Sequence, residues 1–432
     1  MNRNRSARRR SCLLLTVMML AVIFTENVNA AVPESPRESP GAEGAVTESP
    51  RESPGTEETA PETATGLFEE EETAPETATD LFEAGENAAK IEEILAGMTL
   101  EEKICQLFVI TPEALTGSNP VTAAGERTRE AIHATPVAGL VYFNENLKEA
   151  GQIREMLANT QEYSLERTGL PMLLALDEEG GPVRRINGRG ITPDEEIPPM
   201  CEVQDPAYAY EIGCKIGAYL SDLGFNVDFA PVADVLTNPD NTVVRERSFG
   251  SDPDQVATLV ASVVKGLREN GIAATLKHFP GHGSTSEDSH AEYACSYQTE
   301  EELFRSDLVP FLAGIREGAE LIMAGHISLP NVTGDLIPAS LNRLVLTSIL
   351  REKMHYDGIV ITDALNMGAI TEHYDSADAA VMAVQAGCDL LLMPADFHAA
   401  RSGIRSAVEN GVISEERIDE SVRRVITLRL GM

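Results

Sequence analysis

The chain has 432 residues, enough for one large domain or two average ones, and a formal net charge of −35. Phosphate groups would repel such an acidic chain, so we expect no nucleic acid among its partners. Its 6 cysteines are widely spaced and include no CxxC pair, so the sequence shows neither a disulfide framework nor a zinc motif.

The first thirty residues have the pattern of a secretory signal peptide. Five arginines within residues 3–10 precede the run CLLLTVMMLAVIF, which is short for a membrane span, and small residues precede Ala31. No second long apolar run follows. We therefore expect residues 1–30 to be a signal peptide, the protein to be secreted or held at the cell surface, and no permanent membrane span.

Residues 31–88 have a different composition. The segment ESPRESPG occurs at 34–41 and 48–55, and ETAPETAT occurs at 58–65 and 72–79. Pro, Glu, Ala and Thr dominate, and few apolar side chains are available to offset the entropy lost on ordering. This composition predicts a disordered acidic spacer that holds a catalytic body away from a surface.

From residue 89 to residue 432, short apolar runs alternate with amphipathic stretches, several of which end in Gly as helices do. Thr99 and Glu102 form a capping box that opens a helix before the first run. Near-continuous apolar runs are typical of parallel strands buried on both faces, and eight occur, at 105–110, 137–143, 171–177, 225–232, 272–279, 321–327, 358–365 and 388–394. Eight such units predict a single (β/α)8 barrel of the TIM type, with a doubly wound open sheet as the alternative. Cys105 and Cys388 lie in apolar segments and are predicted to be core residues.

Polar side chains collect where the predicted strands end. The residues concerned are Asp177, Asp234, Lys277, His278, His326 and Asp363. Because the site of such a barrel lies at the carboxyl ends of its strands, this distribution favours one shared site.

Asp363 ends a buried strand, where a carboxylate is costly unless it is paired or used. A helix N-cap is the alternative. Lys277 and His278 are adjacent, so they point to opposite faces of a strand unless Pro280 and Gly281 break the backbone. Lys277 is then either a substrate clamp or part of a structural Lys–Asp pair.

The segment KHFPGHGSTSEDSH, residues 277–290, contains three histidines. The carboxylate of Asp288 can accept the N–H of His290 two residues later and raise its basicity, which would make a general acid/base unit. A zinc site that includes His282, a phosphate-binding loop and a plain solvated loop are the alternatives.

Three further polar residues are candidate ligands of a substrate. Asp177, in DEEGG, could accept two hydrogen bonds from hydroxyl groups. Arg185 and Arg247 either bind a ligand or pair with these acids.

Several motifs together resemble one family. MTLEEKICQLF, DEEGGPVRRI, FAPVADVLTNP, RSFGSDP, KHFPGHGSTSEDSH and ITDALNM follow one another between about residues 90 and 430. In this order they are similar to the motifs of glycoside hydrolase family 3, and more narrowly to its β-N-acetylglucosaminidase (β-N-acetylhexosaminidase) branch. Family 3 β-glucosidases generally lack the His-ended loop.

The resemblance implies a retaining exo-glycosidase that removes terminal N-acetylglucosamine from glycans such as muropeptides or chito-oligosaccharides. It implies that Asp363 is the nucleophile and that His290, assisted by Asp288, is the acid/base. It further implies that the sugar hydroxyls are held by Asp177, Arg185, Arg247, Lys277 and His278.

The same resemblance implies no metal and no other cofactor, and we expect a monomer. A family 3 β-glucosidase and a mixed hydrolase/phosphorylase are alternatives, the second because a neutral histidine would not repel phosphate. A non-catalytic glycan-binding protein is a more distant alternative.

Overall fold

The computed structural model describes residues 78–193, 196–285 and 294–432, with side chains from Asn87 onward. The predicted signal peptide and most of the predicted spacer therefore lie outside the described residues. The first helix, α1, spans Ala78–Gly97, so the boundary predicted at residue 89 lies inside it. Ala and Glu, which are common in this stretch, are strong helix formers, whereas the composition predicts a spacer up to residue 88.

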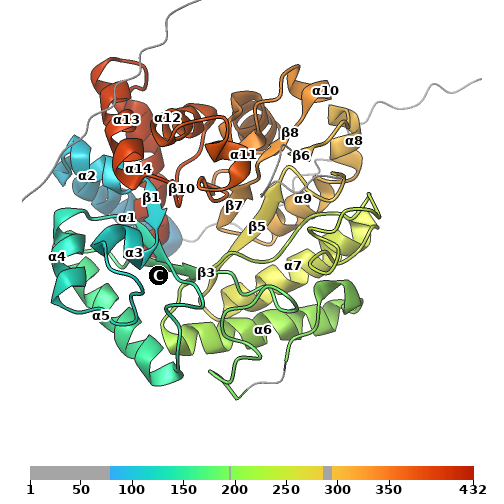
Figure 1. Cartoon of the computed structure of the whole chain (residues 1–432), viewed down its shortest axis with the longest axis horizontal. Helices are drawn as coiled ribbons and strands as arrows, with labels where there is room; N and C mark the ends of the chain where they lie inside the picture. The colour runs from blue at the N-terminus through green and yellow to red at the C-terminus, as the bar shows by residue number, and fades with distance from the viewer. Residues whose placement is uncertain (1–77, 194–195, 286–293) are drawn as a thin grey trace, which may run out of the picture. The chain divides into compact units, whose positions relative to one another are not determined.

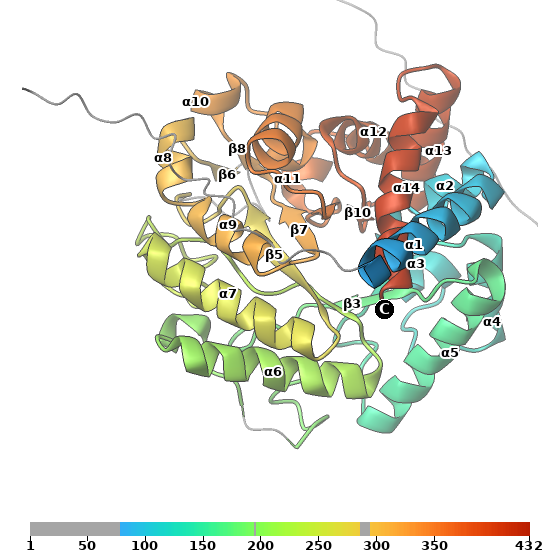
Figure 2. The same cartoon turned by 180° about the vertical axis from the view of Figure 1, so that it is seen from behind.

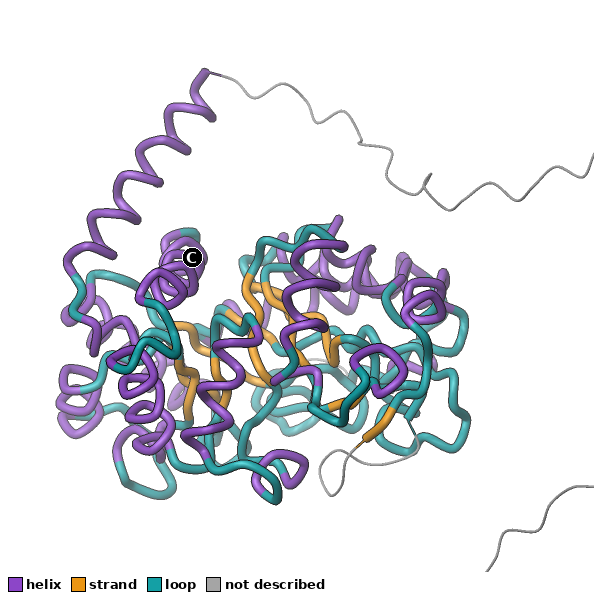
Figure 3. The backbone as a smooth tube through the Cα atoms, turned by 90° about the horizontal axis from the view of Figure 1, so that it is seen from above, coloured by secondary structure: helices purple, strands orange, loops and turns teal. Residues whose placement is uncertain are grey.

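Eight parallel strands form a barrel at the centre of the described residues (Figure 3). They are β1 (Phe108–Ile110), β2 (Gly139–Val141), β3 (Leu173–Leu176), β4 (Val227–Asp228), β5 (Ala273–Phe279), β7 (Leu321–Ala324), β9 (Ile359–Thr362) and β10 (Leu391–Leu392). The order of pairing is β10-β1-β2-β3-β4-β5-β7-β9. A parallel bridge between Ile361 and Leu390 joins its two ends. The predicted (β/α)8 barrel is confirmed, and each predicted apolar run contains one strand.

Helices surround the strands on the outside (Figures 1 and 2). Besides α1 they are α2 (Leu100–Cys105), α3 (Pro112–Thr116), α4 (Glu126–Ala134), α5 (Ala150–Thr168), η1 (Met200–Glu202), α6 (Pro206–Leu223), α7 (Pro253–Glu269), α8 (Glu300–Arg305), α9 (Val309–Arg316), α10 (Pro330–Thr333), η2 (Ala339–Leu341), η3 (Leu344–Lys353), α11 (Gly368–Thr371), α12 (Ser376–Ala386), α13 (Phe397–Glu409) and α14 (Glu415–Leu430). The capping box of Thr99 and Glu102 opens α2, as predicted. Cys105 ends this helix instead of starting a strand, and both it and Cys388 are buried. None of the described helices is long and apolar enough to cross a membrane.

Alternate residues of each strand face two different apolar layers. On β3, Leu173 and Ala175 pack inside the barrel, whereas Leu174 and Leu176 pack against the helices. Successive strand residues point to opposite faces, and here both faces are covered. This double burial is the reason that the strands are continuous apolar runs in the sequence.

The last helix closes the amino-terminal end of the barrel. Val425 of α14 packs among the inward-facing strand residues. The buried Arg429 donates hydrogen bonds to the side chain of Gln106 and to the carbonyl of Pro171, which lie two residues before β1 and β3. The carboxyl-terminal end of the barrel is thereby left for a site.

Candidate active site

A cavity of about 360 Å³ lies at the carboxyl ends of the strands. Its polar lining brings together the six described residues that the family resemblance implied for the site, namely Asp177, Arg185, Arg247, Lys277, His278 and Asp363. The other polar strand ends, Asp234 and His326, do not line it. The rest of the lining is mostly apolar and includes Val141, Phe143, Phe229, Met323, Met367, Leu392 and Met393. The two remaining predicted site residues, Asp288 and His290, lie outside the described residues.

A larger hollow of about 810 Å³ is lined by residues of η3, α12 and α14. None of the predicted site residues lines it, and it lies among outer helices instead of at the strand ends. We therefore place the candidate active site in the smaller cavity.

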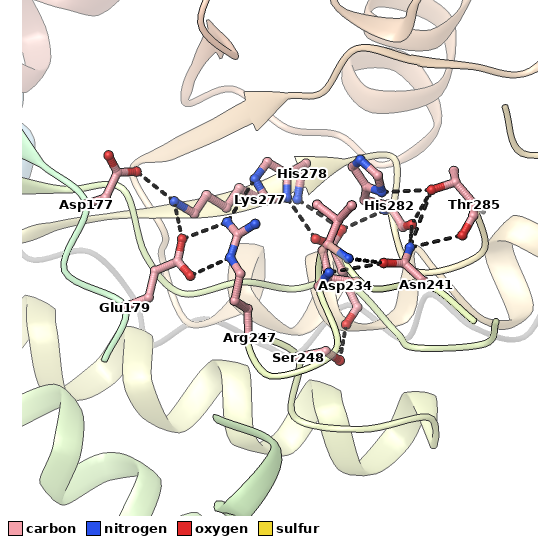
Figure 4. A network of polar contacts seen from close by, with 12 residues as sticks. Asp177, Glu179, Asp234, Asn241, Arg247, Ser248, Lys277, His278, His282 and Thr285 are labelled. Carbon is pink, nitrogen blue, oxygen red and sulfur yellow. Dashed lines mark hydrogen bonds and ion pairs between the residues drawn. The ribbon is translucent and has the colours of Figure 1, made fainter. Parts of the chain in front are cut away.

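Lys277 is the centre of a buried ion cluster (Figure 4). Its Nζ lies 2.9 Å from Asp177 Oδ1 and 2.6 Å from Glu179 Oε1, and its side chain is 2% exposed. Arg247 donates from Nε and Nη2 to the two carboxylate oxygens of Glu179, and both distances are 2.8 Å. Burial alone would lower the pKa of Lys277, but the carboxylates of Asp177 and Glu179 outweigh it and raise the pKa. Burial would likewise raise the pKa of Glu179, yet Arg247 and Lys277 hold it well below its usual range. Lys277 and Glu179 are therefore both held in their charged forms near neutral pH.

The consecutive acids of DEEGG point in different directions. Asp177 faces the cavity and accepts from Arg185 Nη2 at 3.2 Å, while Glu179 enters the ion cluster. Glu178 between them accepts the backbone N–H groups of Arg185, Ile186 and Asn187 and the hydroxyl of Tyr219. Asp177 and Glu179 are two residues apart and so lie on the same side of the extended backbone. Glu178, on the other side, fixes the turn that carries Arg185.

His278 is oriented by a buried carboxylate. Its Nδ1 lies 2.8 Å from Asp234 Oδ2, and Asp234 Oδ1 accepts the backbone N–H groups of His278 and His282. A carboxylate can only accept, so Nδ1 carries a proton, and Nε2 lies 3.3 Å from Arg247 Nη2. The peptide bond between Lys277 and His278 is cis, and both side chains line the same cavity.

Asp363 follows β9 and lines the same cavity. The next helix, α11, is capped by Met367, so the alternative that Asp363 is a helix N-cap is wrong. Its Oδ1 accepts the N–H of Ala364 at 2.7 Å. Burial would raise the pKa of Asp363, but the imidazoles of His326 and His278 outweigh it and lower the pKa. The carboxyl group is therefore held as an anion, the form that a nucleophile requires.

The segment that leaves β5 is tightly packed as far as residue 285. A methyl group in place of the Gly283 hydrogen would come 1.8 Å from the carbonyl oxygen of Val235. Asn241 donates to the carbonyls of His282 and Thr285 at 2.8 and 3.0 Å. Figure 4 shows His282 turned toward Thr285, and His282 does not line the cavity. The described start of this segment is thus fixed against the loop that follows β4.

Residue 294, where the described chain resumes, begins a short strand. β6 (Ala294–Cys295) pairs in parallel with β8 (Ile327–Ser328), which follows barrel strand β7. Strands of two residues leave no periodic pattern in a sequence, so this small sheet was not predicted.

One residue of the site was not predicted as part of it, and another was expected there only as a polar strand end. Glu179 belongs to the quoted DEEGG motif, and its position two residues after Asp177 was the available signal. Asp234 was noted only as a polar strand end. Its role depends on the backbone N–H groups of His278 and His282, contacts that residue spacing does not encode.

Asp307 is a buried acid beneath the start of the same segment. It accepts a hydrogen bond from Gln298 at 2.9 Å and packs against Gly281, where an added methyl group would come 2.7 Å from its Oδ1. Burial raises the pKa of Asp307 to about 6 from the ordinary 3.8. The folded protein therefore keeps a proton on Asp307 between pH 4 and 6 that the unfolded chain has released.

We expect Asp307 to lower the free energy of unfolding as the pH rises across that window. Above pH 6, the difference between the two pKa values corresponds to a loss of about 3 kcal/mol in the free energy of unfolding. Asp307→Asn removes the titration and should be more stable than the wild type above pH 6, by a margin that shrinks toward pH 4. Urea unfolding of both proteins between pH 4 and 8 measures the margin. A margin that does not change with pH would contradict the raised pKa.

Comparisons with known proteins point to one family. The sequence matches the glycosyl hydrolase family 3 N-terminal domain over residues 99–428. Beta-hexosaminidase A of Pseudoalteromonas piscicida is 32% identical over 324 residues, which cover 69% of this chain and 54% of the relative. The beta-hexosaminidase of Hydrogenovibrio crunogenus is 33% identical over 288 residues, which cover 65% of this chain and 79% of the relative.

A solved structure is similar as well. A glycoside hydrolase family 3 β-N-acetylglucosaminidase from Paenibacillus sp. str. FPU-7 superposes with a TM-score of 0.73 at 38% identity. The superposition covers 78% of this chain and 63% of that chain. The chain thus spans 54% of the first relative's length and less than two thirds of the solved structure.

Proposed function

Because the chain belongs to glycoside hydrolase family 3, we propose that it is a retaining exo-β-N-acetylhexosaminidase that removes terminal N-acetylglucosamine from glycans. One observation carries the proposal: an anionic carboxylate, Asp363, shares a single cavity with a charged clamp built around Lys277. The names of the similar proteins support the choice of N-acetylated sugar.

In the proposed reaction, Asp363 attacks the anomeric carbon and forms a covalent glycosyl-enzyme. The bond to the leaving oxygen breaks as that oxygen takes a proton from His290. Water then attacks the same carbon while His290 takes back a proton, and Asp363 departs. The roles of His290 and of its partner Asp288 rest on the resemblance of the loop sequence alone.

The remaining predicted residues are proposed to hold the sugar. Lys277 has three donors, and Asp177 and Glu179 each engage one, so one donor is left for a hydroxyl group. Asp177, Arg185 and His278 add further donors and acceptors in the same cavity. A pyranose has hydroxyl groups at its rim and C–H groups on its faces, which suits a cavity lined by both polar and apolar side chains.

Turnover of two nitrophenyl glycosides tests the sugar specificity. We expect kcat/KM for the β-N-acetylglucosaminide to exceed that for the β-glucoside by at least about 100-fold, because a site built to bind a polar substituent discriminates against its absence. Comparable values would favour a β-glucosidase or a mixed enzyme. Sugar binding without release of nitrophenol from either compound would favour a glycan-binding protein.

The same assay gives the stereochemistry and the acceptor. A retaining enzyme releases the β-anomer first, which proton NMR detects, and release of the α-anomer would contradict the covalent intermediate. When phosphate is added to the assay, the product should still be the free sugar. Formation of a sugar 1-phosphate would instead identify a phosphorylase.

The predicted signal peptide leads us to propose that the protein acts outside the cytoplasm. Its glycan would then be cell-wall fragments, chito-oligosaccharides or glycans of a host. Release of N-acetylglucosamine from muropeptides, chitobiose and host-type glycans, measured side by side, distinguishes these sources.

A further inference from the structure

His326 is a buried imidazole that lies behind the wall of the candidate active site. It follows β7 and does not line the cavity. The residue before it is anchored twice: Gly325 donates its N–H to the carbonyl of Phe279 at 2.8 Å and accepts the N–H of Ser340 at 3.1 Å. His326 is thus held on a rigid support between β5 and η2.

Two hydrogen bonds determine which nitrogen of His326 carries the proton. Nε2 lies 3.0 Å from the carbonyl oxygen of Ala364, which can only accept, so Nε2 must carry a hydrogen. Nδ1 lies 2.8 Å from the hydroxyl of Ser340, which donates to it in the neutral ring and accepts from it in the protonated ring. In either form the Nε2–H of the ring is directed at Ala364.

Ala364 connects this ring to Asp363. Its N–H donates to Asp363 Oδ1 at 2.7 Å, while its carbonyl is held by His326. The backbone N–H of Asp363 in turn donates to the carbonyl of Ala324 at 2.8 Å, two residues before His326. The carboxylate and the imidazole are consequently joined by hydrogen bonds on both sides of the Asp363–Ala364 backbone.

We propose that His326 is a positioning residue, which holds the Ala364 carbonyl through Nε2–H and so fixes the direction of the Asp363 carboxylate. The inference rests on the proposed function, in which Asp363 is the nucleophile. Loss of the imidazole removes the partner of Ala364 without removing any group that faces the substrate. The chemical step should therefore suffer more than substrate binding.

Electrostatics point the same way. Among the described residues, the charged and titratable groups that act on Asp363 are His326 after β7, His278 and Lys277 of β5, and His282 after β5. After burial, which acts in the opposite direction, His326 has the largest effect on the pKa of Asp363 and lowers it. Removing the imidazole should therefore move the acid limb of the kcat/KM profile to higher pH.

Three variants test the role. We expect His326→Leu to lower kcat by about 10- to 100-fold, the range found for residues that orient a reacting group, with KM for the nitrophenyl N-acetylglucosaminide unchanged within about twofold. His326→Gln supplies an amide N–H of similar reach and should recover most of kcat. His398→Gln, on the exposed side of α13, is the matched control and should behave as the wild type.

The outcomes separate this inference from the proposed function. An inactive wild type would refute the proposed function. An active wild type with an unchanged kcat in His326→Leu would refute only the positioning role. Equal losses in the Leu and Gln variants, without a shift of the acid limb, would mean that His326 is merely structural.

A second variant keeps the test decisive if His326→Leu does not fold, as judged by circular dichroism. Ser340→Ala removes the hydroxyl at Nδ1 but leaves the ring in place. It should lower kcat several-fold and move the acid limb in the same direction. A Ser340→Ala enzyme with wild-type kcat and pH profile would overturn the proposal in that case.

Discussion

Asp363→Ala is expected to abolish turnover of the nitrophenyl N-acetylglucosaminide, with kcat lowered on the order of 10⁴-fold or more. The variant removes the carboxylate that attacks the anomeric carbon, and no other described carboxylate takes its position at the end of β9. The fold should survive, because among the described contacts the Asp363 side chain accepts only the N–H of Ala364, and the backbone N–H that donates to Ala324 is kept in the variant. Stopped assays with high enzyme concentrations measure the residual rate.

Azide makes this prediction specific to a nucleophile. It fits into the space left by the missing carboxylate and attacks from the same face, so Asp363→Ala should regain activity and form the α-glycosyl azide. Asp396→Asn, which changes an exposed helix N-cap of α13, is the control and should keep wild-type turnover. A wild-type rate in Asp363→Ala, or a β-glycosyl azide as product, would contradict the assignment.

The barrel could be predicted because its strands are buried on both faces. Residues such as Leu173 and Leu174 face different apolar layers, so the whole run is apolar and visible in the sequence. The strand lengths could not be predicted in the same way. In β10 only Leu391–Leu392 pairs as a strand, although the apolar run is longer, because the flanking residues are buried without forming a regular ladder.

The polar residues of the site were found by their position at strand ends, but their pairing was not. Lys277 was expected to bind either a substrate or an Asp, and the structure shows that it contacts Asp177 and Glu179 together. Which carboxylate of DEEGG enters the cluster depends on Glu178 being held by the backbone of Arg185. Such backbone contacts are formed by almost any sequence and leave no signal in it.

The ion cluster leads to the second large effect, on stability. Lys277→Met is expected to lower the free energy of unfolding by about 3–5 kcal/mol, because it leaves Glu179 and Asp177 with one cationic partner fewer in a site that excludes water. Urea unfolding measures this loss, and kcat/KM should fall with it. Lys353→Met is the matched control: this lysine pairs with Glu300 on the surface, where an ion pair contributes no more than about 1 kcal/mol.

A double-mutant cycle shows whether the charges act as one unit. Glu179→Gln alone leaves Lys277 and Arg247 short of a carboxylate and should also cost about 3–5 kcal/mol. Lys277→Met combined with Glu179→Gln removes one charge of each sign, so the loss should be smaller than the sum by about 0.5–3 kcal/mol. Strictly additive losses would mean that the two groups are solvated independently. In that case water reaches Lys277 and Glu179 more than their burial indicates, and these two residues would bind a sugar only weakly.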